Sequence, residues 1–325
     1  MATNGTSFIM NESYGNGEEL KKTEEPTNSP RKIRWLNVTI ILYLHITAVY
    51  SLYLCFVSVK WRTIIFSYIL FVLANIGTNA GSHRLWSHRS YKAKLPMEII
   101  LMLFTCIAYE MTAFFWARLH RMHHKHCDTD ADPHNSTRGF FYSHIGWFLV
   151  DRHPDVIKYR QKVDISDLRA NPVLMFQEKY AVPLVSLCCF ILPTIIPMYF
   201  WGETFNNAYH TAILRYVLNI NASFLINSAA HMWGAKPYDK NIFPTENIAV
   251  SIATLGEGFH NYHHTFSWDY RAAELGNNNW NLTTKFIDFF AWIGWAYDLK
   301  TVSDDIVMKR ASRTGDGSKI CSTKQ

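Results

Sequence analysis

The sequence predicts an all-α integral membrane fold class, with four transmembrane helices and a cytosolic helical cap that holds a histidine-rich di-metal site. Long apolar runs recur along the 325 residues, and a helix of about 20 apolar residues crosses the roughly 30 Å hydrocarbon core of a bilayer. Short histidine clusters follow several of these runs. The 21 Phe, 17 Tyr and 11 Trp also suit a membrane protein with aromatic rings at the interface.

One membrane domain, residues 35–310, is expected between two tails. Residues 1–34 are mostly polar with mixed charge, which predicts a disordered cytosolic N-terminal tail. Residues 311–325 are expected to form a flexible cytosolic C-terminal tail. The four runs long enough to span a membrane lie at about 35–57, 62–80, 182–201 and 211–230.

A fifth apolar run, 95–115, contains Glu98 and Glu110 and is expected to lie in the membrane interface without crossing. The histidines give the reason. If they form one metal site, they must all lie on one side of the membrane, and a crossing over 95–115 would separate His83 from His120.

The charges beside the first two spans bear on orientation. Arg31, Lys32 and Arg34 precede the first span, which places the N-terminus on the cytosolic side by the positive-inside rule. Lys60 and Arg62, in the first hairpin loop, favour the opposite orientation. The requirement that the histidines share one side is the stronger constraint, so we expect the site and both termini to be cytosolic.

Charge and cysteine usage exclude several classes of protein. The net charge is +6, but the sequence has no basic stripe with interleaved aromatic residues and no nucleic-acid motif. Membrane lipid and anionic small molecules are therefore the expected partners, and nucleic acid is not. The six cysteines form no CxxC pair, which argues against a disulfide framework or a zinc-thiolate site and favours a reducing compartment.

Three histidine boxes and one further motif carry the chemistry. They are HRLWSH at 83–88, HRMHH at 120–124, HNYHH at 260–264 and NSAAH at 227–231. On a helix, residues at i, i+3 and i+4 share a face, so His120 lies above His123 and His124, which diverge by about 100°. His83 and His88 are five apart, about 140° on an ideal helix, so the helix is expected to end or distort near Trp86.

Nine candidate imidazoles are too many for one ion and suit two. Imidazole binds iron, copper, zinc and nickel, and the absence of HExxH argues against a zinc protease. DTDADPH lacks the glycine and glutamate of a calcium loop. Asp128, Asp130 and Asp132 are expected instead to accept hydrogen bonds from ligand histidines, or to cap the helix that follows. His126 and His134 fall off the box spacing and are expected not to be ligands.

At this point the sequence resembles a known family, the membrane acyl-CoA (stearoyl-CoA type) desaturases. The blocks that carry the resemblance run in order from about residue 35 to 318, and it is closest to insect members, including moth desaturases that make pheromone precursors. They are GSHRLWSHRSYKAKLP, WARLHRMHHKHCDTDADPHN, RGFFYSHIGWFLV, NSAAHMWGAKPYDKNI, LGEGFHNYHHTFSWDYRAAELG and GWAYDLKTVS.

The resemblance implies a cytosolic di-iron centre on an endoplasmic reticulum membrane protein. Its ligands would be His83, His88, His120, His123, His124, His231, His260, His263 and His264, with Asn227 reaching one metal through water. By analogy with the family, one iron would take His83, His88, His120, His124 and His264. The other would take His123, His231, His260 and His263.

The resemblance also implies the reaction. Two irons and dioxygen would introduce a double bond into a saturated fatty acyl-CoA, at a Delta-9 or Delta-11 position, for unsaturated fatty acid or pheromone-precursor biosynthesis. As in the family, electrons would come from cytochrome b5 and its reductase. The sequence contains no HPGG signature of a fused haem domain, so the donor is expected to be a separate protein. Double-bond position and geometry, chain length and oligomeric state remain open.

Substrate contacts are expected at Trp116, Arg118 and Arg152. Arg118 matches a family arginine that contacts CoA, whereas Leu119 and Met111 replace residues that are usually polar in the family. Phe71, on the second span, is hypothesised to limit the acyl chain length.

Two rival functions remain at this stage. A membrane fatty acyl hydroxylase or conjugase could use the same histidine boxes. A non-catalytic multispan metal-binding protein could also carry a histidine-rich cytosolic face, although it would be expected to have charged groups lining a path through its spans, and the spans here are almost free of charge.

Overall fold

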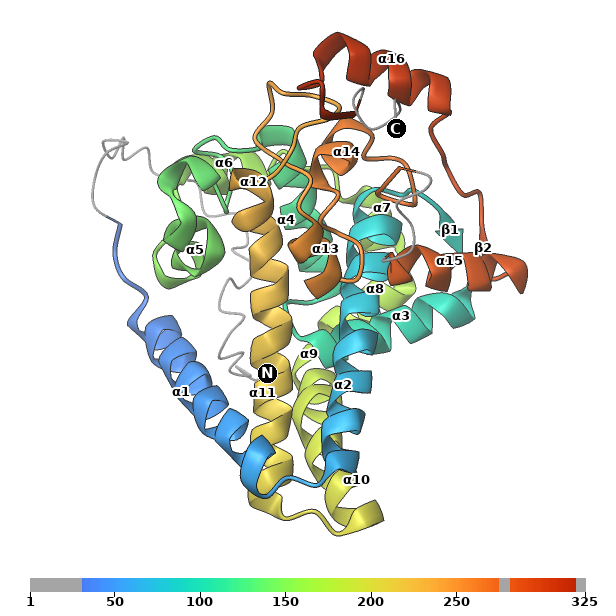
Figure 1. Ribbon diagram of the computed structural model, residues 1–325. Helices are drawn as coiled ribbons and strands as arrows, with labels where there is room; N and C mark the ends of the chain where they lie inside the picture. Colours follow the sequence, from blue (N-terminus) through green and yellow to red (C-terminus); the bar gives the residue numbers. More distant parts are fainter. Residues whose placement is uncertain (1–30, 275–280, 320–325) are drawn as a thin grey trace, which may run out of the picture.

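The computed structural model describes residues 31–274 and 281–319, and most of these are helical (Figure 1). The elements of the first half are α1 (Trp35–Val57), α2 (Trp61–Ile76), η1 (Gly77–Ser87), β1 (Lys92–Ala93), α3 (Leu95–Ala108), α4 (Ala113–His126), η2 (Ser136–Arg138), η3 (Tyr142–Gly146), α5 (Trp147–Leu149), α6 (Pro154–Arg160), α7 (Ser166–Ala170) and α8 (Pro172–Lys179). Those of the second half are α9 (Ala181–Val185), η4 (Ser186–Ile191), α10 (Leu192–Trp201), α11 (Phe205–Asn227), α12 (Ala229–Met232), α13 (Ile248–Ala253), α14 (His260–Thr265), α15 (Leu282–Trp292), β2 (Ala296–Tyr297) and α16 (Asp304–Thr314). Strands β1 and β2 pair antiparallel.

Three helical segments of the described chain are long and apolar enough to cross a membrane: Trp35–Val57, Trp61–Ser87 and Ala181–Trp201. They match three of the four predicted spans, although the second continues to Ser87. The predicted fourth span, 211–230, lies mostly in α11, which is not among these segments. Its hydropathy is lowered by polar side chains that are buried within the fold, including Asn207, Arg215 and Asn219.

The fifth apolar run does not form one straight helix. It divides into α3 and α4, whose axes meet at 83°, and the pair would count as a fourth candidate span only if the bent helices were taken together. Tyr109 ends α3 in a left-handed conformation, with φ of 49°. Thr112 then begins α4, where its side chain accepts a hydrogen bond from the Phe115 amide. The bend turns α4, which carries the second histidine box, away from the direction of α3.

The end of the second span is π-helical over Gly77–Ser87. Hydrogen bonds in a π-helix join residues five apart, and the His88 amide donates to the His83 carbonyl oxygen at 3.1 Å. This places the two rings on one side, with their centroids 4.9 Å apart. The predicted distortion of the helix is confirmed, and it resolves the awkward five-residue spacing of the first box.

The far end of the bundle is tied together by one carboxylate. Glu203, between α10 and α11, accepts hydrogen bonds from the Lys60 amide at 2.9 Å and the Thr63 hydroxyl at 2.6 Å. It also accepts one from Asn207 at 3.0 Å. The loop between α1 and α2 and the loop between α10 and α11 therefore lie together, at the end of the molecule remote from α14 and α16 (Figure 1).

The expected domain limits need adjustment at the C-terminus. Helix α16 continues to Thr314, whose hydroxyl donates to the Tyr238 carbonyl oxygen at 2.7 Å, and the Lys236 amide donates to Asp316 at 2.5 Å. The described part of 311–325 is thus packed on the domain and is not a flexible tail. Residues 1–30 of the predicted N-terminal tail, and 320–325, lie outside the described residues.

The π-helix η1 and helix α3 approach each other closely at Gly77, the first residue of η1. A Cβ atom at this position would lie 2.5 Å from the Phe104 carbonyl carbon, so any larger side chain requires the backbone to move. We expect Gly77→Ala to lower the free energy of unfolding by about 1–3 kcal/mol, the usual cost of overpacking. Thermal unfolding in detergent measures this. Ser67→Ala is the control, because Ser67 lies on the preceding helix α2 and contacts Thr211 of α11, not α3. Equal midpoints for the two variants would contradict the close approach.

Candidate metal centre

Nine histidines from four elements converge at the upper end of the bundle. His83 and His88 end the π-helix η1, and His120, His123 and His124 lie on α4. His231 lies on α12, and the third box forms α14. Figure 1 shows η1, α4, α12 and α14 gathered at this end, above the long helices.

The first group contains five histidines: His83, His88, His120, His124 and His263. Their Nε2 atoms face one another. The Nε2 atom of His263 lies 2.9 Å from those of both His83 and His124, and the Nε2 atoms of His88 and His120 are also 2.9 Å apart.

The second group contains four histidines: His123, His231, His260 and His264. The Nε2 atom of His260 lies 3.0 Å from that of His231 and 3.1 Å from that of His264. His263 and His264 are therefore exchanged relative to the expected division between the two irons. The reason is helical: His260 and His264, at i and i+4, share one face of α14, whereas His263 is rotated by about 100° from His264.

The spacing of these nitrogens suits two metal ions. A metal–imidazole bond is about 2.0–2.1 Å for zinc, so two nitrogens at a right angle around one ion lie about 2.9 Å apart. The observed Nε2 separations of 2.9–3.1 Å match that value. Two bare imidazoles at this distance can share only one proton, whereas a common cation satisfies both lone pairs.

Three buried carboxylates orient the ligand rings from behind. Asp132 accepts from His123 Nδ1 at 2.8 Å, Asp128 accepts from His231 Nδ1 at 2.9 Å, and Glu257 lies 2.9 Å from His83 Nδ1. A hydrogen bond at Nδ1 fixes the tautomer and leaves the Nε2 lone pair for a metal. The structure thus places Asp128 and Asp132 where they were expected, and adds Glu257.

Asp130 does not share this role. It is exposed and pairs with Arg138 at 2.5 Å, away from the ligand rings. This ion pair joins two residues of the segment that follows α4, near the surface, and does not contact a ligand histidine. The alternation of aspartates in DTDADPH hid this difference, since Asp128 and Asp132 turn inward and the residue between them turns out.

Asp128 is held in a strained backbone conformation. Its φ is 56°, in the left-handed region that non-glycine residues seldom adopt. Its two carboxylate oxygens accept from the Ser136 amide at 2.9 Å and from His231, and the Asp128 amide donates to Asp132 at 2.8 Å. The tight turn after α4 therefore delivers two carboxylates to two different histidines.

The protonation states suit metal binding. Burial alone would raise the pKa of Glu257, but the adjacent Arg84 and His83 hold that pKa at about 2. On α14, burial lowers the pKa of His260, His263 and His264 well below the usual value. Ionised carboxylates behind neutral imidazoles are the state that binds a cation.

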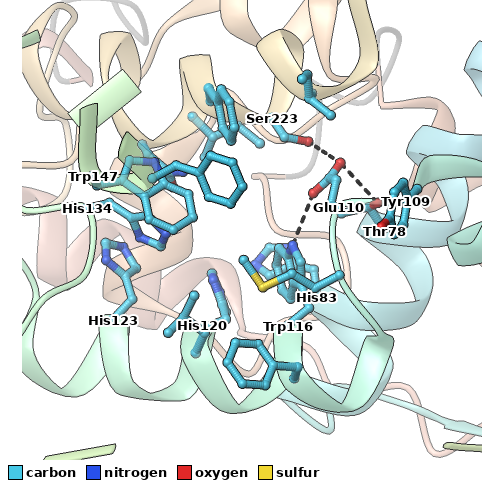
Figure 2. Close-up of a pocket in the computed structure, with 18 of the residues that line it drawn as sticks. Thr78, His83, Tyr109, Glu110, Trp116, His120, His123, His134, Trp147 and Ser223 are labelled. Atoms are coloured by element: carbon cyan, nitrogen blue, oxygen red, sulfur yellow. Dashed lines mark hydrogen bonds between the residues drawn. The ribbon is translucent and has the colours of Figure 1, made fainter. Parts of the chain in front are cut away.

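A cavity of about 180 Å³ leads to the histidines. His83, His120, His123 and His260 line it, together with aromatic and aliphatic side chains such as Phe115, Phe148 and Ile220. Figure 2 shows Glu110 and Trp116 on the side of His83, and His134 and Trp147 on the other side.

Glu110 is the polar centre of this cavity. It accepts hydrogen bonds from Ser223 at 2.5 Å, Trp116 at 3.1 Å and Thr78 at 3.3 Å (Figure 2). These donors come from α11, α4 and η1, so one carboxyl group joins three elements at the break between α3 and α4. The sequence carries one indication that Glu110 has a special role: it is one of only two carboxylates, with Glu98, in the apolar run 95–115.

The sequence model of the family described as "Fatty acid desaturase" matches residues 60–275. The chain belongs to the fatty acid desaturase family. The chain is 61% identical to the "Acyl-CoA Delta(11) desaturase" of Trichoplusia ni over 295 residues, 90% of this chain and 84% of the relative. It is 56% identical to the "(11Z)-hexadec-11-enoyl-CoA conjugase" of Bombyx mori over 97% of this chain and 95% of that protein. With the "Acyl-CoA Delta-9 desaturase" of Acheta domesticus it shares 54% identity over 93% of this chain and 84% of the relative.

The expected substrate residues of this desaturase divide into two pairs. Trp116 and Arg152 line the cavity, as do Met111 and Leu119 at the two positions that depart from the family pattern. Arg118 does not; its guanidinium donates to the Arg160 carbonyl oxygen at 2.9 Å and so joins α4 to α6. Phe71 is also absent from the residues that line the cavity and stacks on Tyr68.

The residues at the edge of the boxes also separate. His126 packs against Tyr159, and His134 packs against Trp147. Both rings lie outside the two histidine groups. Asn227, the last residue of α11, lines the cavity beside the second group.

We expect His123→Ala to reduce the bound metal of this desaturase from two ions per chain toward one, because His123 belongs to the second group. Elemental analysis of the purified protein measures this. His134→Ala is the matched control, since it removes a buried histidine on the same side of the cavity that is outside both groups. Loss of metal from the control, or two ions retained in His123→Ala, would contradict the assignment.

Arg84 compensates the buried charge of Glu257. It donates to Glu257 at 2.6 Å and also to Thr284 and the Tyr270 carbonyl oxygen, with its side chain 1% exposed. We expect Arg84→Leu to lower the free energy of unfolding by about 3–5 kcal/mol, the cost of leaving a buried charge unpaired.

The control for Arg84→Leu is Arg89→Leu, which removes an arginine that is 52% exposed and paired with Asp167. An exposed pair contributes about 1 kcal/mol or less. Thermal unfolding of both variants in detergent provides the comparison, and similar midpoints would show that the Arg84–Glu257 pair does not stabilise the site.

Proposed function

We propose that this chain, an acyl-CoA desaturase by its family and its relatives, introduces a Delta-11 double bond into a saturated fatty acyl-CoA. The observation that carries this is the placement of two histidine groups at the end of a largely apolar cavity. Two of the most similar relatives, at 61% and 62% identity, are named for the Delta-11 position, whereas the Delta-9 relative is 54% identical.

The metals are proposed to be two iron ions, held by the groups of five and four histidines. With two electrons from outside, such a centre activates dioxygen, the co-substrate, for removal of two vicinal hydrogens. The protein positions the chain and excludes water. His83, His123 and His231 would be held in place by Glu257, Asp132 and Asp128, so that the Nε2 atoms keep their directions through the reaction.

The acyl chain is proposed to enter the cavity between Trp116 and Trp147. Its methylenes would pass His83 and His120 on one wall and Phe224 on the other. The hydrogen bonds of Glu110 to Trp116, Ser223 and Thr78 fix the wall at this point. Arg152, at the cavity margin, supplies a positive charge for the CoA phosphates.

The membrane arrangement is proposed to be four spans, with α11 as the fourth. Helix α11 is 23 residues long and packs among α1, α2 and α10, which shield its polar side chains from lipid. The bent pair α3 and α4 would then lie at the interface. The histidine groups and both termini would face the cytosol from the endoplasmic reticulum membrane, where cytochrome b5 and its reductase supply electrons.

A second candidate activity is conjugase chemistry on an acyl chain that already has a double bond. The Bombyx mori relative, at 56% identity over 97% of this chain, carries that name. The same cavity and histidines would serve both reactions, so the two differ in which acyl chain is accepted.

Expression in a yeast strain that lacks its own desaturase tests the proposal. We expect new monounsaturated acyl chains with the double bond at carbon 11, located by mass spectrometry of derivatised products. The matched control is the His264→Ala variant, which should express but form no product because it removes a ligand of the second group. Dienes formed only from a supplied monounsaturated chain would favour the conjugase activity. Absence of any unsaturated product would contradict both the desaturase and the conjugase activity.

A further inference from the structure

A second hollow reaches the histidine groups from another direction. It is lined by residues of α14, of the loop that follows α14 and of α16, together with Asp239 and Ile242 from the loop between α12 and α13. It shares no lining residue with the acyl cavity. His264 lies on its wall, and among the four histidines of the second group His264 is the one that is partly exposed. Figure 1 shows α16 above α14, at the end of the molecule remote from the loop between α1 and α2.

The face of α16 toward this hollow is basic with an apolar centre. Ile306, Lys309, Arg310 and Arg313 all line the hollow and follow helical spacing along one side of α16. Arg310 is paired with Asp239. Lys309 and Arg313 are exposed and form no ion pair with any acidic group in the described part of the chain. Trp268, 47% exposed, and Ile306, 53% exposed, supply the apolar surface between them.

Desaturation requires electrons to enter the protein. Removal of two hydrogens from the acyl chain releases two electrons, and reduction of dioxygen to two waters consumes four, so two electrons and two protons must be supplied. Under the proposed function the donor is a separate protein, and electron transfer slows steeply with distance. A partly exposed metal ligand beneath a basic surface therefore offers a short route for the electrons.

We propose that the surface formed by Trp268, Ile306, Lys309 and Arg313 is the docking surface for an acidic one-electron carrier protein, with His264 the ligand nearest to the docked carrier. This inference rests on the proposed function. Interfaces of electron carriers are small and are guided by complementary charge, and a basic rim around one exposed indole fits that description. The arrangement also separates the two inputs, because the acyl chain and the electrons approach the metals through different openings.

The test uses the full-length, metal-loaded enzyme in detergent and the soluble haem domain of cytochrome b5 as the probe. Its affinity for wild type, Arg313→Glu and Lys309→Glu is measured by titration at low and high salt. We expect each reversal to weaken binding about tenfold or more at low salt, with a smaller difference at high salt, because like charges then face each other and salt screens them. Arg169→Glu is the matched control, since Arg169 is an exposed arginine of α7, outside this surface.

Unchanged affinity in both reversals, or equal weakening in Arg169→Glu, would overturn the docking surface. Weakened binding of acyl-CoA with unchanged binding of the haem domain would also overturn it and would assign the hollow to CoA. A single turnover of chemically reduced enzyme reports separately on the proposed function. Wild type and both reversals should give equal product there, and no product from wild type would overturn the desaturase proposal, while the affinities alone decide the docking surface.

Discussion

The structure depends on keeping nine imidazoles, in two groups, within bonding distance of two points in space. No single helix can do this, so the chain brings the rings together from η1, α4, α12 and α14. In η1, α4 and α12, one ring is then fixed from behind. Glu257, Asp132 and Asp128 hold one ring apiece through Nδ1, and Arg84 balances the first of these charges. The polar network is buried, so a missing partner would cost several kcal/mol.

The same constraint shapes the rest of the fold. The bend at Tyr109 and Thr112 returns α4 toward η1, and the π-helix lets His83 and His88 face one site. These elements line the cavity, and Glu110 fills the corner that the bend creates by accepting hydrogen bonds from α4, η1 and α11. The bend and the π-helix are thus two backbone irregularities that position the histidine groups beside the cavity.

The sequence predicted the parts of the structure that depend on period and length. The spans at 35–57 and 182–201, the shared face of His120 and His124, and the distortion before His88 all follow from helical geometry. The sequence also predicted a span at 211–230, but α11 begins at Phe205 and is not among the apolar candidate spans, because buried polar residues such as Arg215 and Asn219 lower its hydropathy. The sequence did not reveal Glu257, because a carboxylate three residues before a box gains its role only from a tertiary contact with His83.

The exchange of His263 and His264 needed the structure, because His263 and His264, at i+3 and i+4, both lie on the side of α14 that His260 faces. The positions of the ring nitrogens place His264 with His260 and His263 with the other group, whereas the family analogy divided them the other way. Mössbauer spectroscopy of purified, iron-loaded enzyme tests the resulting account most directly. It predicts two irons per chain in two distinct environments, one with five imidazoles and one with four. One iron per chain, or two irons in a single shared environment, would contradict it.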